Sequence, residues 1–277
     1  MMTIDCELRV FHPAARNINY ARSCEPLVAK RIYEHEGFRF VKGQLSAASH
    51  LKNMRENGLD FALISGLGWQ NPEIRLENNR YVRWCVRRYP RKFRGFFVID
   101  SRDVRSALVE IDSLDTSVFV GVEIMNNYSG GKIDDPRIQP IFDAIREKNL
   151  ILKLYAAHPI QTIDGDSAYR ILAMIRRNPE LKILVGHLGG LLCLYGLLPE
   201  VRQELKNVFF ITSVSSTMKM VEFAASVNPD NLVFGSDAPF NHCFSQRSPL
   251  NSLGELNLTR KIKSKILSYN ARHLIEI

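Results

Sequence analysis

Apolar residues gather in eight short runs along the chain, and most of these runs are continuous rather than alternating. Continuous runs of this length are typical of parallel strands that are covered on both faces. The predicted strands are residues 3–10, 60–64, 95–99, 119–124, 150–154, 183–185, 208–211 and 232–234. The hydrophobic pattern therefore predicts one parallel sheet that uses the whole length of the chain.

Segments with a helical period lie between these runs, and several carry signals for helix ends. Asp103 and Asp135 each stand before such a segment as N-cap residues, while Gly58 and Pro90 follow two others as stop signals. The predicted helices are residues 44–57, 78–89, 104–113, 136–148, 166–177, 199–205, 217–226 and 258–269, with a further short one near 25–35.

Eightfold alternation of strand and helix predicts an α/β fold, a single (β/α)8 TIM barrel over residues 1–277. A doubly wound open sheet is the alternative, but no Gly-x-Gly-x-x-Gly follows the first strand. No repeat or linker-like stretch divides the chain, which favours one domain. The long first connection, residues 11–43, is expected to form part of a substrate pocket or a lid.

Composition limits the class of protein. The hydrophobic fraction of 45% is ordinary for a soluble globular chain. No apolar run reaches the roughly 18 residues of a membrane helix, and the first residues lack the basic-then-apolar pattern of a signal peptide. The five cysteines are scattered without a Cys-x-x-Cys pair, which argues against a zinc ribbon or a redox motif. We therefore expect a cytoplasmic protein that does not act in membranes.

The net charge is +8, and much of it comes from one basic stretch. Its members are Arg80, Arg83, Arg87, Arg88, Arg91, Lys92 and Arg94. Apolar residues, Trp84 among them, interleave with the charges, as on an amphipathic helix with a solvated basic face. This pattern favours attraction of an anionic small substrate or an acidic partner over nucleic-acid binding, for which a basic patch alone is weak evidence.

Polar residues follow several predicted strands directly. His187 and Asp237 come after the runs 183–185 and 232–234, and Glu7, Arg9 and Glu123 lie near the ends of earlier runs. In a parallel barrel the carboxyl ends of the strands form the active face. We therefore predict His187 and Asp237 as catalytic residues, and Glu7, Arg9 and Glu123 as substrate-binding residues.

Further candidates follow the fifth, seventh and eighth strands. Tyr155 and His158 come after the run 150–154, Ser213 after 208–211, and His242 lies in the loop behind Asp237. Each has an ordinary interpretation: Tyr155 as a packing residue, the two histidines as solvent-exposed loop residues. We include Tyr155, His158 and His242 among the predicted substrate-binding residues.

At this level of detail the chain resembles a known family. The most specific stretches are residues 179–190, which contain Gly186-His187-Leu188-Gly189-Gly190, and residues 234–240, Phe-Gly-Ser-Asp-Ala-Pro-Phe. Residues 134–142 and 266–272 also match. The chain is similar to the amidohydrolase superfamily, in the amidohydrolase-related branch that includes the aminocarboxymuconate-semialdehyde decarboxylase-like enzymes.

The resemblance implies a divalent metal, often zinc. Its ligands in the family are a His-x-His pair on the first strand, histidines after the fifth and sometimes the sixth, and an aspartate after the eighth. Here Glu7 and Arg9 stand in place of the pair, and Tyr155 stands at the position of the next histidine. The ligands still available are Glu7, His158, His187 and Asp237, with His158 contributing only if its loop folds inward.

Arg9 cannot serve as a ligand, because a guanidinium is always charged and offers no lone pair. A simpler arrangement is that Arg9 replaces the charge of the metal and pairs with Glu7, with Asp237 or with an anionic substrate. Catalytic zinc needs three or more protein ligands, and without the His-x-His pair the ligand count falls short of such a set. We therefore expect the usual metal to be absent, with zinc as the ion if one is bound.

Two classes of function remain open. The first is an amidohydrolase-related enzyme for a small anionic molecule, which hydrolyses a C–N or C–O bond or, as second choice, decarboxylates an acid. Asp237 or His187 would activate water, and Arg9 would stabilise an oxyanion or anchor a carboxylate. The second is a degenerate barrel kept as a binding or interaction protein, since fold alone does not decide function. Because many relatives are dimers, we also expect a homodimer.

Overall fold

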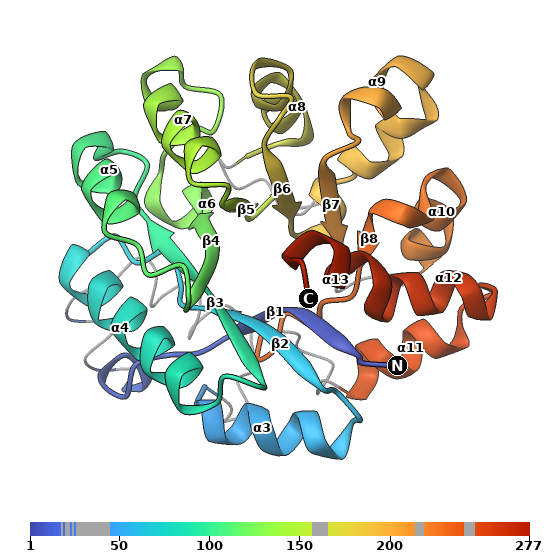
Figure 1. The fold of residues 1–277 in the computed structure, drawn as a ribbon, viewed down its shortest axis with the longest axis horizontal. Coiled ribbons are helices and arrows are strands. Elements are labelled where there is room, and N and C mark those ends of the chain that lie inside the picture. Colours follow the sequence, from blue (N-terminus) through green and yellow to red (C-terminus); the bar gives the residue numbers. More distant parts are fainter. Residues whose placement is uncertain are drawn as a thin grey trace.

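The computed structural model describes residues 1–17, 19, 23, 25, 45–156, 166–213, 219–240 and 247–277. Eight parallel strands follow one another in chain order around a ring, with helices outside it (Figure 1). The strands are β1 Ile4–Arg9, β2 Phe61–Ser65, β3 Phe93–Ile99, β4 Phe119–Ile124, β5 Ile151–Leu154, β6 Lys182–Val185, β7 Val208–Ile211 and β8 Leu232–Val233. The amides of Cys6 and Arg9 donate to the carbonyls of Phe234 (2.8 Å) and Ala238 (2.9 Å), which joins β1 to the β8 segment. The predicted (β/α)8 barrel is confirmed.

Helices cover the outside of the ring in the described part of the chain. The α-helices are α3 Ala47–Glu56, α4 Pro72–Arg88, α5 Val104–Asp112, α6 Asn126–Ser129, α7 Gln139–Glu147, α8 Ala168–Arg177, α9 Pro199–Glu204, α10 Lys219–Val227, α11 Arg247–Glu255, α12 Arg260–Ser264 and α13 Asn270–Ile275. Shorter turns are η1 Ala14–Arg16, η3 Pro136–Ile138, η4 His187–Gly189, η5 Leu192–Leu197, η6 Pro229–Asn231 and the π-helix η7 Lys265–Tyr269.

Some helix predictions were wrong in their limits. Helix α4 begins at Pro72, six residues before the predicted start, because the Asn71 side chain accepts from the amides of Glu73 (2.9 Å) and Ile74 (3.2 Å). The predicted helix 258–269 is instead α12 followed by the π-helix η7. There the carbonyl of Ile266 accepts from the Phe234 amide at 2.9 Å, which ties the wider turn to the β8 segment. Helices α6, α11 and α13 were missed, and most of the predicted helix near 25–35 lies outside the described residues.

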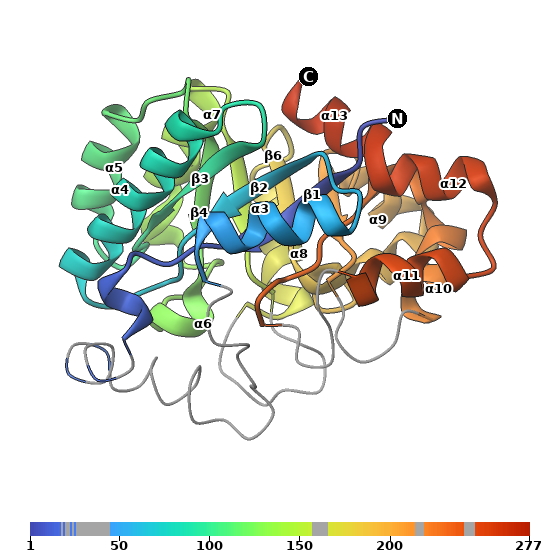
Figure 2. The same ribbon diagram turned by 90° about the horizontal axis from the view of Figure 1, so that it is seen from below.

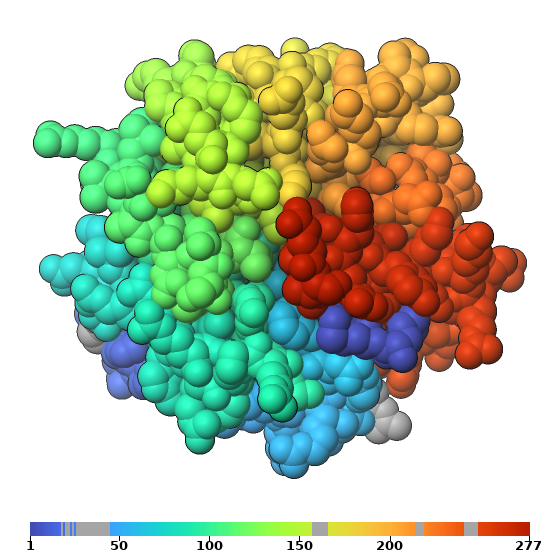
Figure 3. Space-filling view, in the orientation of Figure 1, coloured from blue at the N-terminus to red at the C-terminus, as the bar shows by residue number. Residues whose placement is uncertain are grey.

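The two ends of the barrel differ. The chain termini and α13 lie at one end, and α6 lies at the other, where the strands have their carboxyl ends (Figure 2). In the space-filling view the C-terminal residues lie beside the N-terminal strand and cover the first end (Figure 3). Here Phe96, Leu184 and Ile211 of the strands share one buried apolar cluster with Leu274 of α13. This end is therefore filled with apolar side chains, and polar chemistry is confined to the opposite end.

Helix α4 carries the first four members of the basic stretch, Arg80 to Arg88, whereas Arg91 and Lys92 lie in the turn that follows and Arg94 lies on β3. Val82, Cys85 and Val86 form its buried face, and Arg87 pairs with Asp115 at 2.9 Å. Trp84 is 53% exposed and stacks on Tyr81, with ring centroids 5.7 Å apart, so it does not belong to this buried face. None of the described helices is both long enough and apolar enough to cross a bilayer.

Gly121 of β4 is a position where the barrel tolerates no side chain. A Cβ atom there would lie 2.0 Å from the carbonyl oxygen of Ile151 on β5 and 2.9 Å from the ring of Phe96. We expect Gly121→Ala to lower the free energy of unfolding by about 2–3 kcal/mol. The added methyl group would have to displace either the β5 backbone or the packed ring of Phe96, and both shifts weaken packing or hydrogen bonds. Denaturant unfolding measures this. Gly254→Ala, where the added methyl group meets open space, is the control and should be neutral or stabilising.

Candidate active site

Five of the predicted residues meet at the carboxyl end of the barrel. Glu7 and Arg9 lie on β1, Glu123 lies on β4, His187 opens the turn after β6, and Asp237 follows β8. All five are buried, with Glu7, Arg9 and Glu123 at 0% exposure. Strand geometry explains the convergence: alternate residues of a strand share one face, and the ends of neighbouring parallel strands lie close together.

Arg9 is the centre of an ion-pair cluster. Its Nη1 atom donates to both carboxylate oxygens of Glu123, at 2.8 and 2.7 Å, and its Nη2 atom donates to Glu7 Oε1 at 3.0 Å. Nη1 also donates to the hydroxyl of Ser65 at 2.7 Å. Of the partners considered from the sequence, Glu7 is therefore confirmed. No ion pair joins Arg9 to Asp237 among the described residues, and Glu123 is a partner that the sequence did not indicate.

Lys153 of β5 is a site residue that sequence reasoning missed. Its ammonium lies 3.3 Å from Glu123 Oε1 and 3.7 Å from Glu7 Oε1, and it stands over the ring of Phe96. The side chain is buried. A signal was present in the sequence, since Lys153 is the single charged residue in the apolar run 150–154. A lone charge in a strand covered on both faces needs a buried counter-charge.

The carboxylates of Glu7 and Asp237 respond to this cluster in opposite ways. Burial disfavours the charge of Glu7, but Lys153, Arg9 and His187 outweigh it and hold the pKa of Glu7 below its usual value. Burial and the charge of Glu7 raise the pKa of Asp237 well above its ordinary value, against the effect of Arg9. The charges around Glu7 thus favour its ionised form, while Asp237 holds its proton more tightly than an ordinary aspartate does.

His187 and Asp237 share two unusual features. His187 Nε2 lies 3.8 Å from Asp237 Oδ2. Both residues have left-handed backbone conformations, with φ values of 55° and 54°. Such conformations cost non-glycine residues about 1–3 kcal/mol each and persist where the surrounding structure enforces them, often at functional sites. The two residues predicted as catalytic from the sequence therefore lie side by side at the mouth of the barrel.

Neighbouring polar residues fix the cluster in place. Ser213, which follows β7, donates its hydroxyl to Glu7 Oε2. Asp5 Oδ1 accepts from the amides of Glu7 and Ser236, both at 3.0 Å, which ties β1 to the β8 loop. Burial raises the pKa of Asp5 to about 6. His50 Nε2 lies 2.8 Å from the carbonyl oxygen of Arg9.

Of the remaining predicted substrate-binding residues, the structure describes Tyr155 but not the two histidines. Tyr155 follows β5, and its ring lies edge-on to that of His187 with centroids 4.7 Å apart. Burial raises the pKa of Tyr155 well above its ordinary value, so its phenol stays neutral. Tyr155 therefore belongs to the wall of the site. His158 and His242 lie outside the described residues.

Three of the residues can hold a metal ion. One ligand atom each of Glu7, His187 and Asp237 lies within 4.8 Å of the other two. Asp237 Oδ1 is buried without a hydrogen-bond partner in the described part of the chain, so one ligand oxygen is unengaged. This donor set fits one divalent cation with three protein ligands. Three of the four ligands considered from the sequence, Glu7, His187 and Asp237, therefore converge without His158.

Comparison with known proteins agrees with this architecture. A family model described as amidohydrolase matches residues 54–277. Among curated proteins no match is found. The matched region holds Glu123, His187 and Asp237 but leaves out β1 with Glu7 and Arg9, the part of the site where the chain departs most from the expected pattern.

Several solved structures share the fold. The 5-carboxyvanillate decarboxylase of Sphingomonas paucimobilis has a TM-score of 0.80 at 19% identity, over 100% of this chain and 99% of that one. The enzyme of the same name from Novosphingobium aromaticivorans, solved with manganese, has a TM-score of 0.79 at 17% identity, over 100% and 96%. The 2,6-dihydroxybenzoate decarboxylase from Rhizobium has a TM-score of 0.72 at 15% identity, over 100% and 99%. At these identities the likeness shows the fold.

Proposed function

The chain belongs to the amidohydrolase family, and we propose that its barrel mouth decarboxylates a small carboxylic acid, with Asp237 as the proton donor. The observation that carries this proposal is the buried carboxyl of Asp237, which lies 3.8 Å from His187 on a strained backbone and whose pKa is raised well above its ordinary value by burial. Decarboxylation replaces CO2 by a proton at carbon, so it requires an acid that keeps its proton at neutral pH.

The step follows from the residues around Asp237. Asp237 transfers its proton to the unsaturated carbon that bears the carboxylate, and a π-electron pair of the substrate forms the new C–H bond. The C–C bond to the carboxylate then breaks, its electron pair restores the π system, and CO2 leaves. Water returns a proton to Asp237, and the hydroxide that remains combines with CO2 as bicarbonate. Lys153 and Arg9 keep Glu7 ionised next to the reacting acid, and Tyr155 contributes a neutral wall. Burial of these groups excludes water and strengthens each electrostatic interaction.

A divalent ion fits this proposal. Glu7, His187 and one oxygen of Asp237 would hold it, which leaves the second oxygen of Asp237 for the proton, and when bound the ion would supply positive charge that anchors a substrate carboxylate. Arg9 does not have to perform that task, because its terminal nitrogens are engaged by Glu123 and Glu7. We therefore place Arg9 in the support of the site, in contrast to the anchor role considered from the sequence.

Hydrolysis is the weaker version of this function. The sequence favoured it, with Asp237 or His187 as the base that activates water. A base must be free of its proton, and burial beside Glu7 opposes that state at Asp237. The decarboxylases among the structural neighbours also support decarboxylation over hydrolysis.

A non-catalytic binding protein is the second candidate, and one observation favours it. The ion pairs of Arg9 and Lys153 with Glu7 and Glu123 form a closed cluster that stabilises the barrel without any reaction. The strained conformations of His187 and Asp237 are not needed for such a cluster, which is why we prefer the enzyme.

The test is release of CO2 from a panel of aromatic acids that includes 5-carboxyvanillate and 2,6-dihydroxybenzoate, with protein purified without chelators and with manganese added. We expect turnover of at least one acid. Asp237→Asn keeps the size of the side chain and tolerates the left-handed backbone, and it should reduce kcat by at least about a hundredfold.

Asp230→Asn is the matched control, since this carboxylate is exposed and pairs with Lys265. It should leave kcat unchanged. An Asp237→Asn variant as active as the parent would exclude Asp237 as proton donor. A panel without turnover, combined with tight binding of one of the acids, would favour the binding protein.

A further inference from the structure

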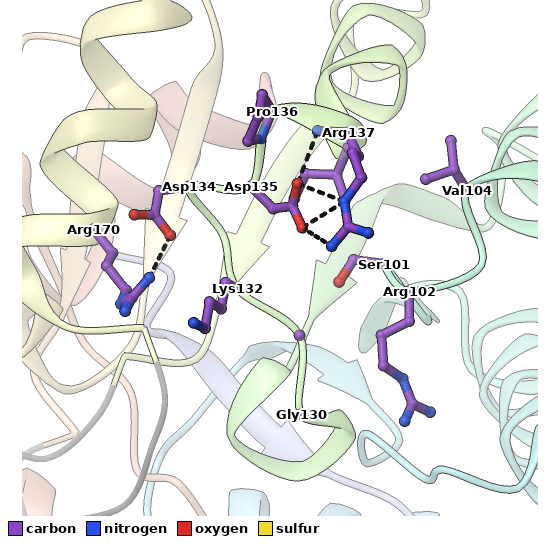
Figure 4. Close-up of a pocket in the computed structure, with 12 residues that line it drawn as sticks. Ser101, Arg102, Val104, Gly130, Lys132, Asp134, Asp135, Pro136, Arg137 and Arg170 are labelled. Carbon is purple, nitrogen blue, oxygen red and sulfur yellow. Dashed lines mark hydrogen bonds and ion pairs between the residues drawn. The ribbon is translucent and has the colours of Figure 1, made fainter.

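A second polar pocket lies at the rim of the barrel, outside the cluster around Arg9 (Figure 4). It has a volume of about 730 Å³, within the range of pockets that hold small molecules. It is formed by the loop between β3 and α5, the segment from α6 to η3 and the start of α8. Neither the proposed decarboxylation nor the ion-pair cluster uses these residues.

Charged side chains dominate the lining. Arg102, Lys132, Arg137 and Arg170 line the pocket together with the carboxylates of Asp134 and Asp135. Each of the three arginines pairs with a carboxylate, since Arg102 binds Asp100 at 2.7 Å. Among the described residues no carboxylate forms an ion pair with Lys132, which is exposed. The pocket therefore offers a lysine ammonium and further cationic surface to a ligand.

The three arginines also keep donors available. Arg137 uses Nε and Nη2 for Asp135, and Arg102 uses the same two atoms for Asp100. Arg170 uses Nη1 for Asp134 at 2.7 Å. Each of these ion pairs leaves one terminal nitrogen unused, and a guanidinium can bind a second anion through that edge. The carboxylates thus fix the orientation of the arginines and leave one terminal nitrogen of each available to a ligand.

The floor of the pocket is rigid. The buried hydroxyl of Ser101 donates to Asn126 Oδ1 at 2.7 Å, and the Asn126 amide donates to Asp166 Oδ2 at 3.0 Å. Above this chain Gly131 packs so closely that a Cβ atom would lie 2.5 Å from Asn126 Oδ1 and 2.8 Å from Ser101 Oγ. The pocket is therefore preformed, which lowers the entropy cost of binding.

We propose that this pocket binds a small phosphate ester, with Lys132 as its main cationic contact. A phosphate monoester carries a charge of about −1.5 to −2 at neutral pH and three acceptor oxygens, so it can engage Lys132 and the unused arginine nitrogens together more fully than a single carboxylate with two oxygens can. Arginine forks match the geometry of phosphate oxygens. Val104, Pro136 and Ile138 provide an apolar wall for the carbon part of the ester.

Calorimetric titration with phenyl phosphate, benzoate and phthalate at fixed low salt tests the proposal, because the three probes share a ring and differ in the anionic group. We expect phenyl phosphate to bind once per chain and more tightly than the other two. Lys132→Met should weaken its binding by about tenfold or more, the loss expected for one charge-assisted contact.

Lys206→Met is the matched control. Lys206 is an exposed lysine outside the pocket lining, so its replacement removes the same charge without changing the pocket. It should leave the dissociation constant of phenyl phosphate unchanged. Equal weakening by both variants would mean non-specific attraction. Equal affinity for phthalate would assign the pocket to dicarboxylates, and binding unaffected by Lys132→Met, or no binding at all, would also overturn the proposal.

Discussion

Replacement of Arg9 by methionine is expected to lower the free energy of unfolding by about 3–5 kcal/mol, the usual cost of removing one partner from a buried ion pair. Arg9 is completely buried and contacts Glu123 and Glu7 at 2.7–3.0 Å. Burial alone would lower the pKa of Arg9, but Glu123 and Glu7 raise it above its ordinary value. The guanidinium is therefore held charged, and without it two carboxylates would share the single ammonium of Lys153.

Chemical denaturation of the Arg9→Met variant measures this loss, and a second variant separates charge from packing. Arg9→Met combined with Glu123→Gln removes one cation and one anion together, so it should be more stable than Arg9→Met alone. Arg102→Met breaks an ion pair of similar length that is partly exposed, and it should cost less than about 1 kcal/mol. If Arg9→Met lowered the free energy of unfolding no more than Arg102→Met does, the ion pairs of Arg9 would be in contact with water, and the large loss expected from their burial would be contradicted.

Most of the fold could be predicted from the sequence because the strands of a covered parallel sheet appear as continuous apolar runs. All eight predicted runs correspond to observed strands, and β4 and β7 have the predicted limits. The errors in helix limits occur where side-chain capping or a hydrogen bond to a distant segment determines the helix, which the hydrophobic period does not reveal. The early start of α4 depends on the Asn71 cap, and the π-helix η7 depends on a bond to the Phe234 amide. Neither leaves a hydrophobic pattern in the sequence.

The site was predictable to the extent that it follows from strand ends. Glu7, Arg9, His187 and Asp237 were selected in this way, and they converge. The arrangement of charges was not predictable, because it joins β1, β4 and β5 across the barrel. Lys153 shows the difference: its isolation in an apolar run indicates a buried charge, but only the structure shows that Glu7 and Glu123 are its partners.

The stability of the protein is expected to fall as the pH rises from about 4 to about 7, because of Asp166. This side chain is buried before α8, where it accepts from the Ile133 amide at 2.9 Å and from the Asn126 amide at 3.0 Å. Burial raises the pKa of Asp166 from 3.8 to about 7, against the lowering effect of these two hydrogen bonds. Between these values the unfolded chain releases the proton while the folded chain keeps it.

The folded state therefore binds more protons than the unfolded state across this window, and its stability decreases by about 1.4 kcal/mol per pH unit, or about 4 kcal/mol in all. Unfolding free energies of the parent and of Asp166→Asn, measured at several pH values from 4 to 8, isolate the contribution. The asparagine mimics the neutral acid, so the parent should lose stability relative to the variant as the pH rises. Asp112→Asn, at a largely exposed carboxylate, should run parallel to the parent. Parallel curves for Asp166→Asn as well would mean that Asp166 ionises in the folded protein as readily as in the unfolded chain, and the buried Ser101–Asn126–Asp166 chain would then hold a charge rather than a proton.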